Sequence, residues 1–473
     1  MDPAGLDAFR HLSVEQLLVP LLLQLAVILL AARAFAAVGR RLGQPSVVGE
    51  IVAGLVLGPS LFGWLAPDAW AWLFRPAFPG VPHELSDPLL AQVFAVLSQL
   101  GLILLLFLVG LEFDFRHLAP RESRGANWRA AMAIALTGIA VPFFLGLGLA
   151  PLMYPHLEPL PETGAPVPEL PFALFLGVAL SITAIPVLAR IMMELNITRT
   201  RLGAITIAAA AVDDAAGWTL LATVAAVART GFEPVATVRM VAETVAFAAV
   251  MLWVVRPMMK RWARWTLRRG ELGLDALAVL LAVLFGCAVV TGVIGIFAVF
   301  GAFLLGAALS DEHEFREKVS AKLRDFVSGF LLPIFFTSTG LRTNVGTLGS
   351  AAMGLWAVAI FAAAVVGKFG GCGVAAWLGG LPRREAACVG AMMSTRGLMA
   401  LVAINLGHEL GVIPPSVYCI LVLTALGTTM MTTPLLVRLM PGTELEPHIR
   451  ASGFVEPRGR RDRPPVAAGG RRP

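Results

Sequence analysis

Long apolar segments follow one another along almost the whole chain, from Val14 to Leu439, and this pattern limits the possible fold more than any other feature. Most of these segments are long enough to cross the hydrocarbon layer of a membrane as a helix, which takes ~20 residues. Hydrophobic residues make up 57% of the chain and charged residues only 14%, whereas a soluble protein carries roughly 25% charged residues. The sequence therefore predicts an all-α, polytopic membrane protein.

The hydropathy of the chain predicts about thirteen membrane-spanning helices. They are expected near Val14–Val38, Val47–Leu65, Leu89–Leu111, Ala130–Leu152, Pro171–Met193, Leu202–Val227, Val235–Val255, Leu274–Val290, Val293–Leu309, Phe326–Leu341, Met353–Leu378, Ala386–Leu406 and Ser416–Leu439. Only Thr291 and Gly292 separate the eighth segment from the ninth, so these two are the most open to a miscount.

Arginine and lysine residues are concentrated in every second loop. The loop after the seventh segment holds six of them, between Arg256 and Arg269, whereas the loop after the fourth segment holds Glu158, Glu162 and Glu169. Cationic loops stay on the cytoplasmic side of a membrane. We therefore expect the N-terminus outside and the C-terminus in the cytoplasm.

The polar parts of the chain give no sign of a soluble catalytic or nucleic-acid-binding domain. The formal net charge is +6, but no basic patch with interleaved aromatic residues is present, so nucleic-acid binding is not expected. No nucleophile–base pair or metal-spaced cluster stands out, which argues against an enzyme and against a bound cofactor. We predict a transmembrane domain over residues 1–442 and a disordered cytoplasmic tail, rich in Arg, Pro and Gly, over residues 443–473.

Two pairs of apolar segments share short glycine-containing motifs. Leu105–Leu111 in the third segment resembles Pro333–Leu341 in the tenth, and Ala53–Gly58 in the second resembles Gly301–Gly306 in the ninth. Both pairs are offset by seven segments, and an odd offset inverts one copy relative to the other in the membrane. Inverted repeats of this kind are typical of secondary transporters.

Two adjacent acids, Asp213 and Asp214, lie at the centre of the sixth segment. A charged carboxylate at the midplane of a membrane costs several kcal/mol, so two neighbours make sense only if protons or cations neutralise them. Successive helical side chains point ~100° apart, which allows one acid to be structural while the other faces a cavity. This pattern favours a site for a proton and a metal cation over the two alternatives, a misassigned loop or a purely structural ion pair.

Two basic residues also lie in the middle of apolar segments. Lys368, in the eleventh segment, needs an acid if it stays in the membrane, and the aspartate pair is the obvious candidate; otherwise its side chain would have to reach the membrane surface. Arg396, in the twelfth segment, either donates hydrogen bonds to the free carbonyls of a broken helix, which we favour, or pairs with an acid.

The fifth and twelfth segments are predicted to be broken helices. Pro186 removes a helical hydrogen bond, and hydroxyl side chains beside it can bond the freed backbone. Interrupted helices at matching positions in two halves of a chain indicate a substrate site, although a proline kink without function is the alternative. The residues expected to line the two breaks are Ser181, Thr183, Ala184 and Pro186 in the fifth segment and Ser394, Thr395 and Arg396 in the twelfth.

With these motifs, the chain resembles the monovalent cation:proton antiporter-2 family, especially the plant and yeast cation/proton exchangers and their bacterial relatives. The resemblance covers nearly all of Val14 to Pro441. It is carried by Gln44–Pro59, Thr183–Arg190, Asp213-Asp214 with Trp218, Leu332–Thr343, Gly367-Lys368 and Thr395–Met399.

The resemblance implies a homodimer in a bacterial inner membrane, in which each protomer has a dimerisation domain and a six-helix core domain with two crossed, broken helices. It implies that Asp214 binds H⁺ and a cation, Na⁺ or K⁺, in turn, that Asp213 pairs with Lys368, and that the core moves in an elevator-like cycle. Relatives with two acids at this place are usually electrogenic. Ser394 departs from the family pattern, in which many relatives have Asn, and this leaves the ion selectivity open.

The mechanism expected from these residues is competition at one carboxylate. Desolvation favours the protonated form of a carboxylic acid, so a cation and a proton can displace one another, and the empty charged site is too costly to move across the membrane. Three other functions remain open at this level: a passive cation channel, a sodium-coupled symporter of an organic solute, and a membrane sensor or assembly factor.

Overall fold

The computed structural model describes residues 14–76, 83–112, 126–160, 164–184, 187–188, 191–192, 195–198, 200–230, 234–268, 272–295 and 298–452. Within these ranges every regular element is a helix. The prediction of an all-α fold is therefore confirmed.

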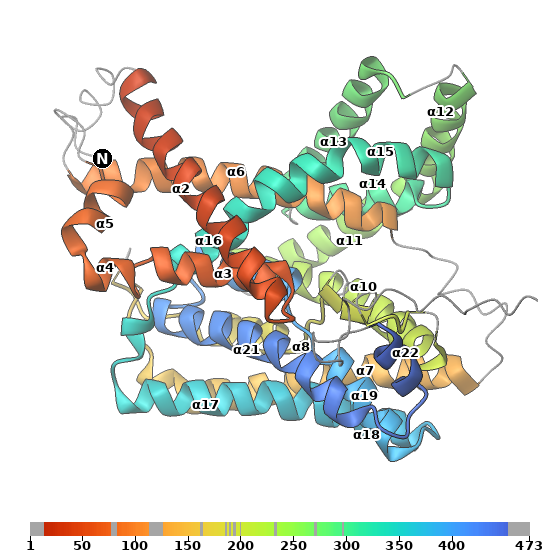
Figure 1. The fold of residues 1–473 in the computed structure, drawn as a ribbon. Helices are drawn as coiled ribbons and strands as arrows, with labels where there is room; N and C mark the ends of the chain where they lie inside the picture. Colours follow the sequence, from red (N-terminus) through yellow and green to blue (C-terminus); the bar gives the residue numbers. More distant parts are fainter. Residues whose placement is uncertain are drawn as a thin grey trace, which may run out of the picture.

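The helices lie in two layers, which we call the upper and the lower layer after their places in Figure 1. The upper layer contains α2 (Val14–Arg41), α3 (Ser46–Leu57), α4 (Phe62–Leu65), α5 (Pro67–Phe74), α6 (His83–Glu112), α13 (Leu274–Ile294), α14 (Ala298–Leu309), α15 (His313–Phe326) and α16 (Leu332–Arg342). The lower layer contains α7 (Ala126–Met153), α8 (Glu169–Ser181), α10 (Arg201–Thr230), α17 (Ala351–Val365), α18 (Gly371–Leu378), α19 (Arg383–Met393), α20 (Leu398–Glu409), α21 (Pro415–Leu439) and α22 (Glu446–Ala451). Helix α11 (Pro234–Val250) runs between the layers. After a π-helical turn at Met251–Val255 it continues as α12 (Arg256–Arg268), which lies beside α15 in the upper layer, at the upper right of Figure 1.

The helices agree with the segments predicted from hydropathy. Each of the thirteen predicted segments overlaps at least one helix. Nine helices in the described ranges are long and apolar enough to cross a membrane, and the apolar helices α8 and α14 are shorter. The eighth and ninth segments are separate helices, because the chain turns at Gly295 with a φ of 95°. The exact number of membrane crossings stays a prediction.

Glycines let pairs of helices in the upper layer touch backbone to backbone. A Cβ atom added at Gly54 of α3 would lie 2.1 Å from the carbonyl oxygen of Thr337 on α16, and one added at Gly340 would lie 2.4 Å from that of Ile51. A real Cβ atom could not be accommodated at these distances, so the two backbones approach this closely only because both helices carry glycine at the crossing.

The second glycine crossing repeats the first with the order of the helices exchanged. A Cβ atom at Gly110 of α6 would lie 2.2 Å from the Phe303 oxygen, and one at Gly306 of α14 would lie 2.1 Å from the Phe107 oxygen. Helices α3 and α16 are the second and tenth predicted segments, and α14 and α6 are the ninth and third. The second segment therefore packs on the tenth in the same way as the ninth packs on the third. This is the packing that inverted repeats relating segments 2 to 9 and 3 to 10 require.

The prediction that the chain is disordered from residue 443 onward is wrong for residues 443–452. Helix α22 follows the last long helix, and Leu445 and Ile449 are both fully buried. They join the apolar cluster that also contains Leu436 and Met440 of the preceding segment. The correction has a simple cause, because two apolar side chains in a polar stretch can bury themselves against the lower layer; residues 453–473 lie outside the described residues.

The close packing of α14 on α6 gives a test of the upper layer. We expect Gly306→Ala to destabilise the protein by about 1–3 kcal/mol or more, because the new methyl group overlaps backbone atoms of α6. Thermal unfolding of the purified protein in detergent measures the change. The matched control is Gly286→Ala on α13, where an added Cβ meets no atom of the described residues within 4 Å. The better helix propensity of Ala should leave the melting temperature of this variant equal or higher. Equal melting temperatures for wild type and Gly306→Ala would contradict the packing described here.

Candidate functional site

Thr183, Asp213 and Lys368 meet inside the lower layer. Lys368 lies in the π-helical turn Val366–Gly370 between α17 and α18. Its Nζ donates hydrogen bonds to Asp213 Oδ2 at 2.9 Å, to Asp213 Oδ1 at 3.0 Å and to Thr183 Oγ1 at 2.6 Å. The backbone N–H of Thr183 donates to Asp213 Oδ2 at 3.0 Å. All three residues are fully buried, so the acid expected for Lys368 is Asp213.

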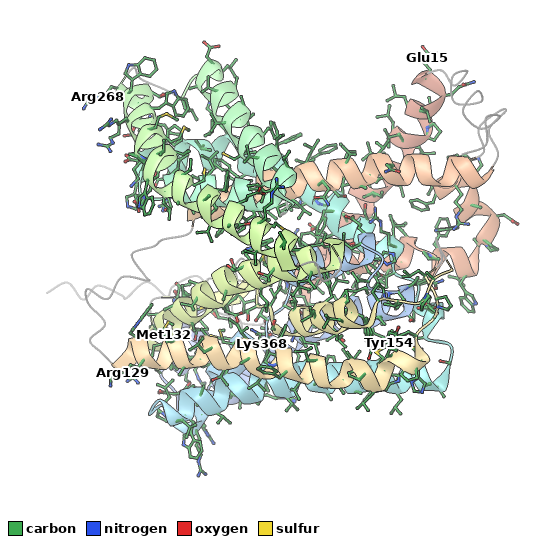
Figure 2. All side chains as sticks on the ribbon, turned by 180° about the vertical axis from the view of Figure 1, so that it is seen from behind. Glu15, Arg129, Met132, Tyr154, Arg268 and Lys368 are labelled. Carbon is green, nitrogen blue, oxygen red and sulfur yellow. The ribbon has the colours of Figure 1, made fainter. Side chains whose placement is uncertain are left out.

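Lys368 lies deep in the bundle and not at its surface. In Figure 2 it is placed between Arg129 and Tyr154, which mark the two ends of α7. Its exposed fraction is 0%, and its three hydrogen bonds account for all the donors of an ammonium group. The alternative in which Lys368 reaches the membrane surface is therefore wrong.

Asp214 is the next residue on α10, and its surroundings differ completely from those of Asp213. It is 1% exposed, yet neither carboxylate oxygen accepts a hydrogen bond with good geometry from the described residues. The indole of Trp218, one helical turn further on, is close enough to interact with this carboxylate, but its Nε1 is also buried without a well-formed hydrogen bond. Buried polar groups are normally paired, so a buried carboxylate without a hydrogen-bond partner among the described residues is unusual.

The chain interrupts two helices of the lower layer at the same place. Helix α8 ends at Ser181, and the helix of the twelfth segment is interrupted between Met393 and Leu398. The two interruptions are joined by hydrogen bonds, from Ala184 N to Thr395 O at 3.2 Å and from Thr183 Oγ1 to Met393 O at 3.2 Å. The interruptions in the fifth and twelfth segments therefore lie side by side, next to Asp213. Pro186, expected to cause the first break, lies outside the described residues.

Arg396 supports the first broken helix. Its guanidinium group donates hydrogen bonds to the carbonyl oxygens of Ala179 and Leu180. These carbonyls belong to the last turn of α8, where no helical N–H group is left to bond them. The side chain is 2% exposed, and of the two roles considered for it the geometry favours the capping of free carbonyls.

The hydroxyl groups at the breaks bond mainly to their own helices. Ser181 Oγ donates to Val178 O at 3.0 Å and Ser394 Oγ to Gly390 O at 2.9 Å. Thr395 Oγ1 donates to Met392 O at 2.7 Å. Each hydroxyl oxygen keeps lone pairs that can face a bound ion.

Two threonines of α21 contact the interrupted twelfth segment and were not among the site residues predicted from the sequence. Thr429 Oγ1 donates to the backbone oxygen of Arg396, and Thr432 Oγ1 lies 3.3 Å from Thr395 Oγ1. A signal was available, because five threonines fall between Thr424 and Thr433 in an otherwise apolar segment. Such hydroxyls commonly replace backbone partners where a neighbouring membrane helix is broken.

The described residues contain no group of three or more His, Cys, Asp and Glu side chains that could hold a resident metal. The charged groups of the site are the paired Asp213 and Lys368, the capping Arg396, and Asp214. Of these, Asp214 is the carboxylate that forms no ion pair with the described residues.

Comparison with known proteins places this chain among the sodium/hydrogen exchangers. Residues 26–439 match the family described as the transmembrane sodium/hydrogen exchanger. The cation/H⁺ antiporter 17 of Arabidopsis thaliana is 36% identical over 453 residues, which cover 95% of this chain and 52% of the plant protein. The Na⁺/H⁺ antiporter NhaS4 of Synechocystis is 36% identical over 425 residues, covering 89% of this chain and 97% of that protein. The chain spans about half the length of the plant relatives it matches.

A solved structure supports the fold. The sodium proton antiporter MjNhaP1 of Methanocaldococcus jannaschii superposes with a TM-score of 0.53 at 15% identity, over 92% of this chain and 99% of the other. Together with the apolar helices, these matches identify a multi-pass membrane protein.

The buried ion pair can be tested by changing its members singly and together. We expect Lys368→Met to destabilise the protein by about 3–5 kcal/mol, because it leaves the Asp213 charge buried without its partner. The double variant Asp213→Asn/Lys368→Met removes both charges and should regain most of the lost melting temperature. A double variant no more stable than Lys368→Met alone would show that the two charges do not compensate each other.

Proposed function

The chain belongs to the sodium/hydrogen exchanger family, and on that premise we propose that it is a secondary active antiporter that exchanges H⁺ for a monovalent cation, Na⁺ or K⁺, at Asp214. The printed names of its relatives include Na⁺/H⁺ and K⁺/H⁺ antiporters. Both ions need the same kind of site, a carboxylate with neutral oxygen ligands.

The observation that carries this proposal is the isolation of Asp214 beside a charge pair that is already balanced. Asp213 and Lys368 neutralise each other at 2.9 Å, while the oxygens of Asp214 are buried without a counter-charge from the described residues. An ionised carboxylate in this position is costly. Binding H⁺ or binding a cation removes that cost, but one carboxylate cannot hold both, and this competition couples the two ions.

The other residues of the site hold Asp214 in a place where this competition is possible. Lys368 and Thr183 fix Asp213 and with it one face of α10. Arg396 opposes the partial negative charge at the C-terminal end of α8. Ser181, Ala184, Ser394 and Thr395 line the crossing of the breaks, where hydroxyl and carbonyl oxygens can replace part of the hydration shell of the cation.

For the transport cycle we propose that the lower layer is the core domain and moves against the upper layer, which forms the dimerisation domain. Exposed apolar side chains of the helices around α11–α13, among them Val245, Trp253, Val289 and Val293, suit a lipid-facing or dimer-forming surface. The distribution of loop charges supports a cytoplasmic C-terminus in a plasma membrane.

The decisive variant is Asp214→Asn, which keeps the size of the side chain but cannot ionise. We expect it to abolish cation-dependent proton movement in proteoliposomes that contain a pH-sensitive dye and are challenged in turn with Na⁺, K⁺ and Li⁺. The matched control is Asp275→Asn, which neutralises an exposed acid at the start of α13 and should leave exchange unchanged. Robust proton-coupled transport by Asp214→Asn would refute the assignment, and cation flux without proton movement in the wild type would indicate a channel.

A further inference from the structure

A small cavity of about 30 Å³, lined by both polar and apolar side chains, lies between the two layers, where α6 and α16 face α20. This is enough room for a water molecule or one small ion. The polar side chains that line it are Ser98, Gln99, Ser338, Thr339, Asn405 and Glu409, together with Arg342. Apart from Arg342, each of them offers an oxygen, the ligand atom that hard cations prefer.

Two hydroxyl groups in this lining have no hydrogen-bond partner in the part of the chain that the structure describes. Ser98 and Ser338 are 9% and 8% exposed, and the buried Oγ atom of each forms no hydrogen bond with the described residues. Unpaired buried hydroxyls are uncommon. One hydroxyl comes from α6 and the other from α16, and both line the same cavity. They therefore indicate that the cavity binds a polar ligand.

The neighbouring Asn405 is fully engaged and fixes the wall around these hydroxyls. Its Nδ2 donates to Thr339 Oγ1 at 3.2 Å and to Leu401 O at 2.9 Å, and its Oδ1 accepts from Tyr418 at 2.9 Å. Thr339 belongs to the upper layer, and Asn405 and Tyr418 to the lower. The cavity is thus held open at a place where polar contacts join the layers.

Glu409 is the acidic side chain of the lining, and its ion pair with Arg342 is weak. Its Oε1 lies 3.7 Å from Arg342 Nη1, and the two side chains are 40% and 32% exposed. An ion pair of this length between partly exposed groups is weak and easily exchanged. A cation that enters from solvent can take the place of the Arg342 guanidinium beside Glu409.

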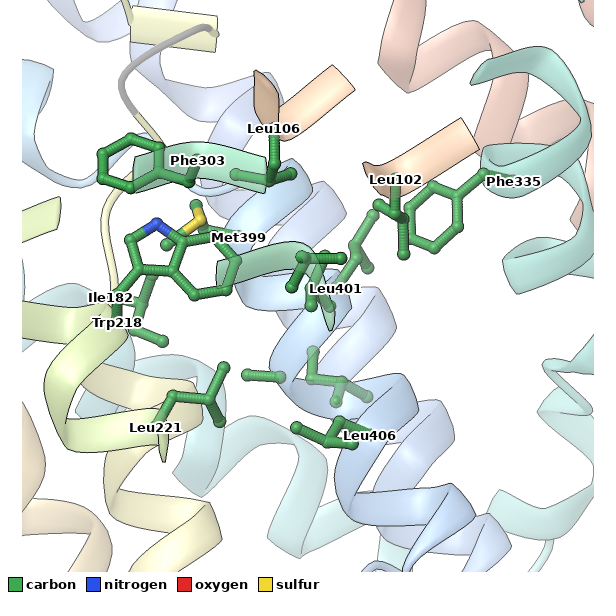
Figure 3. Packing of buried hydrophobic residues seen from close by; sticks show 14 of the residues in the cluster. Leu102, Leu106, Ile182, Trp218, Leu221, Phe303, Phe335, Met399, Leu401 and Leu406 are labelled. Carbon is green, nitrogen blue, oxygen red and sulfur yellow. The ribbon is translucent and has the colours of Figure 1, made fainter. Parts of the chain in front are cut away.

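Apolar side chains line part of the cavity and continue beyond it. Leu102 and Phe335 line the cavity and belong to the same cluster as Leu106, Met399 and Trp218. Figure 3 shows this cluster reaching from Leu102 and Phe335 across to Trp218. Trp218 is the residue one turn from Asp214, so the cluster separates the cavity from the exchange site.

We propose that this cavity is a staging site for the transported monovalent cation, with Glu409 attracting the ion and the Ser98 and Ser338 hydroxyls binding it before the apolar cluster opens toward Asp214. The inference rests on the proposed exchange at Asp214 and adds a second cation site to it. On the orientation expected from the loop charges, the site opens to the outside.

The test compares the cation KM of variants in proteoliposomes loaded with a pH-sensitive dye. The double variant Ser98→Ala/Ser338→Ala should raise the KM for the cation at least about fivefold, the equivalent of one lost hydrogen-bond-type contact, while Vmax stays within about twofold because Asp214 is intact. The matched control is Ser416→Ala, another buried serine with an unpartnered hydroxyl, which does not line the cavity. It should leave the KM unchanged.

Charge variants give a second readout that a merely structural role would not produce. Glu409→Gln should raise the cation KM and weaken its dependence on ionic strength, whereas Arg342→Gln should lower the KM by removing the competitor for Glu409. An unchanged KM in the serine double variant, with normal exchange by the wild type, would overturn the staging site and leave the exchange at Asp214 standing. Wild-type protein that moves no protons would overturn both.

Discussion

Moving a lysine ammonium from water into the interior of a membrane protein costs several kcal/mol, and Lys368 offsets this cost through Asp213 and Thr183. The same three residues come from the turn between α17 and α18, from α10, and from the break after α8. The ion pair therefore joins the three parts of the lower layer that must stay in register around Asp214. Because the pair balances one negative charge with one positive charge, Asp214 is left as the acid of the site that forms no ion pair with the described residues.

The broken helices have a second energetic cost, since they leave backbone N–H and C=O groups without partners in an environment that cannot hydrate them. The protein solves it with side chains from elsewhere in the lower layer. Arg396 bonds the last carbonyls of α8, and Thr429 of α21 bonds the carbonyl of Arg396 in turn. Each break is thus stabilised by the other broken segment or by the helix behind it, and an irregular backbone becomes tolerable beside the ion site.

How much of this follows from the sequence depends on whether a residue has one possible partner or several. The long helices follow from hydropathy, and the pairing of Lys368 follows from the scarcity of acids at membrane depth. The contrast between Asp213 and Asp214 does not follow from the sequence alone, because their adjacency says only that they point in different directions. The roles of Thr429 and Thr432 depend on which helix packs behind the break, and the order up to Ser452 depends on Leu445 and Ile449 finding a buried surface.

The two kinds of helix contact in this fold differ in how easily they can slide. At the crossings of α3 with α16 and of α6 with α14, backbone meets backbone at glycines, and any shift would drive side chains into carbonyl oxygens. Between the layers the contact is made mostly by apolar side chains. The polar contacts among the described residues include the hydrogen bonds that join Thr339 to Asn405 and Tyr418, the Arg342–Glu409 pair and the hydrogen bond from Gln44 to Met430 O. Apolar side chains can repack at a modest cost. The few polar bonds between the layers can stabilise one relative position of the layers without excluding a second one. The contacts between the layers therefore oppose a relative shift less than the glycine crossings inside the upper layer do.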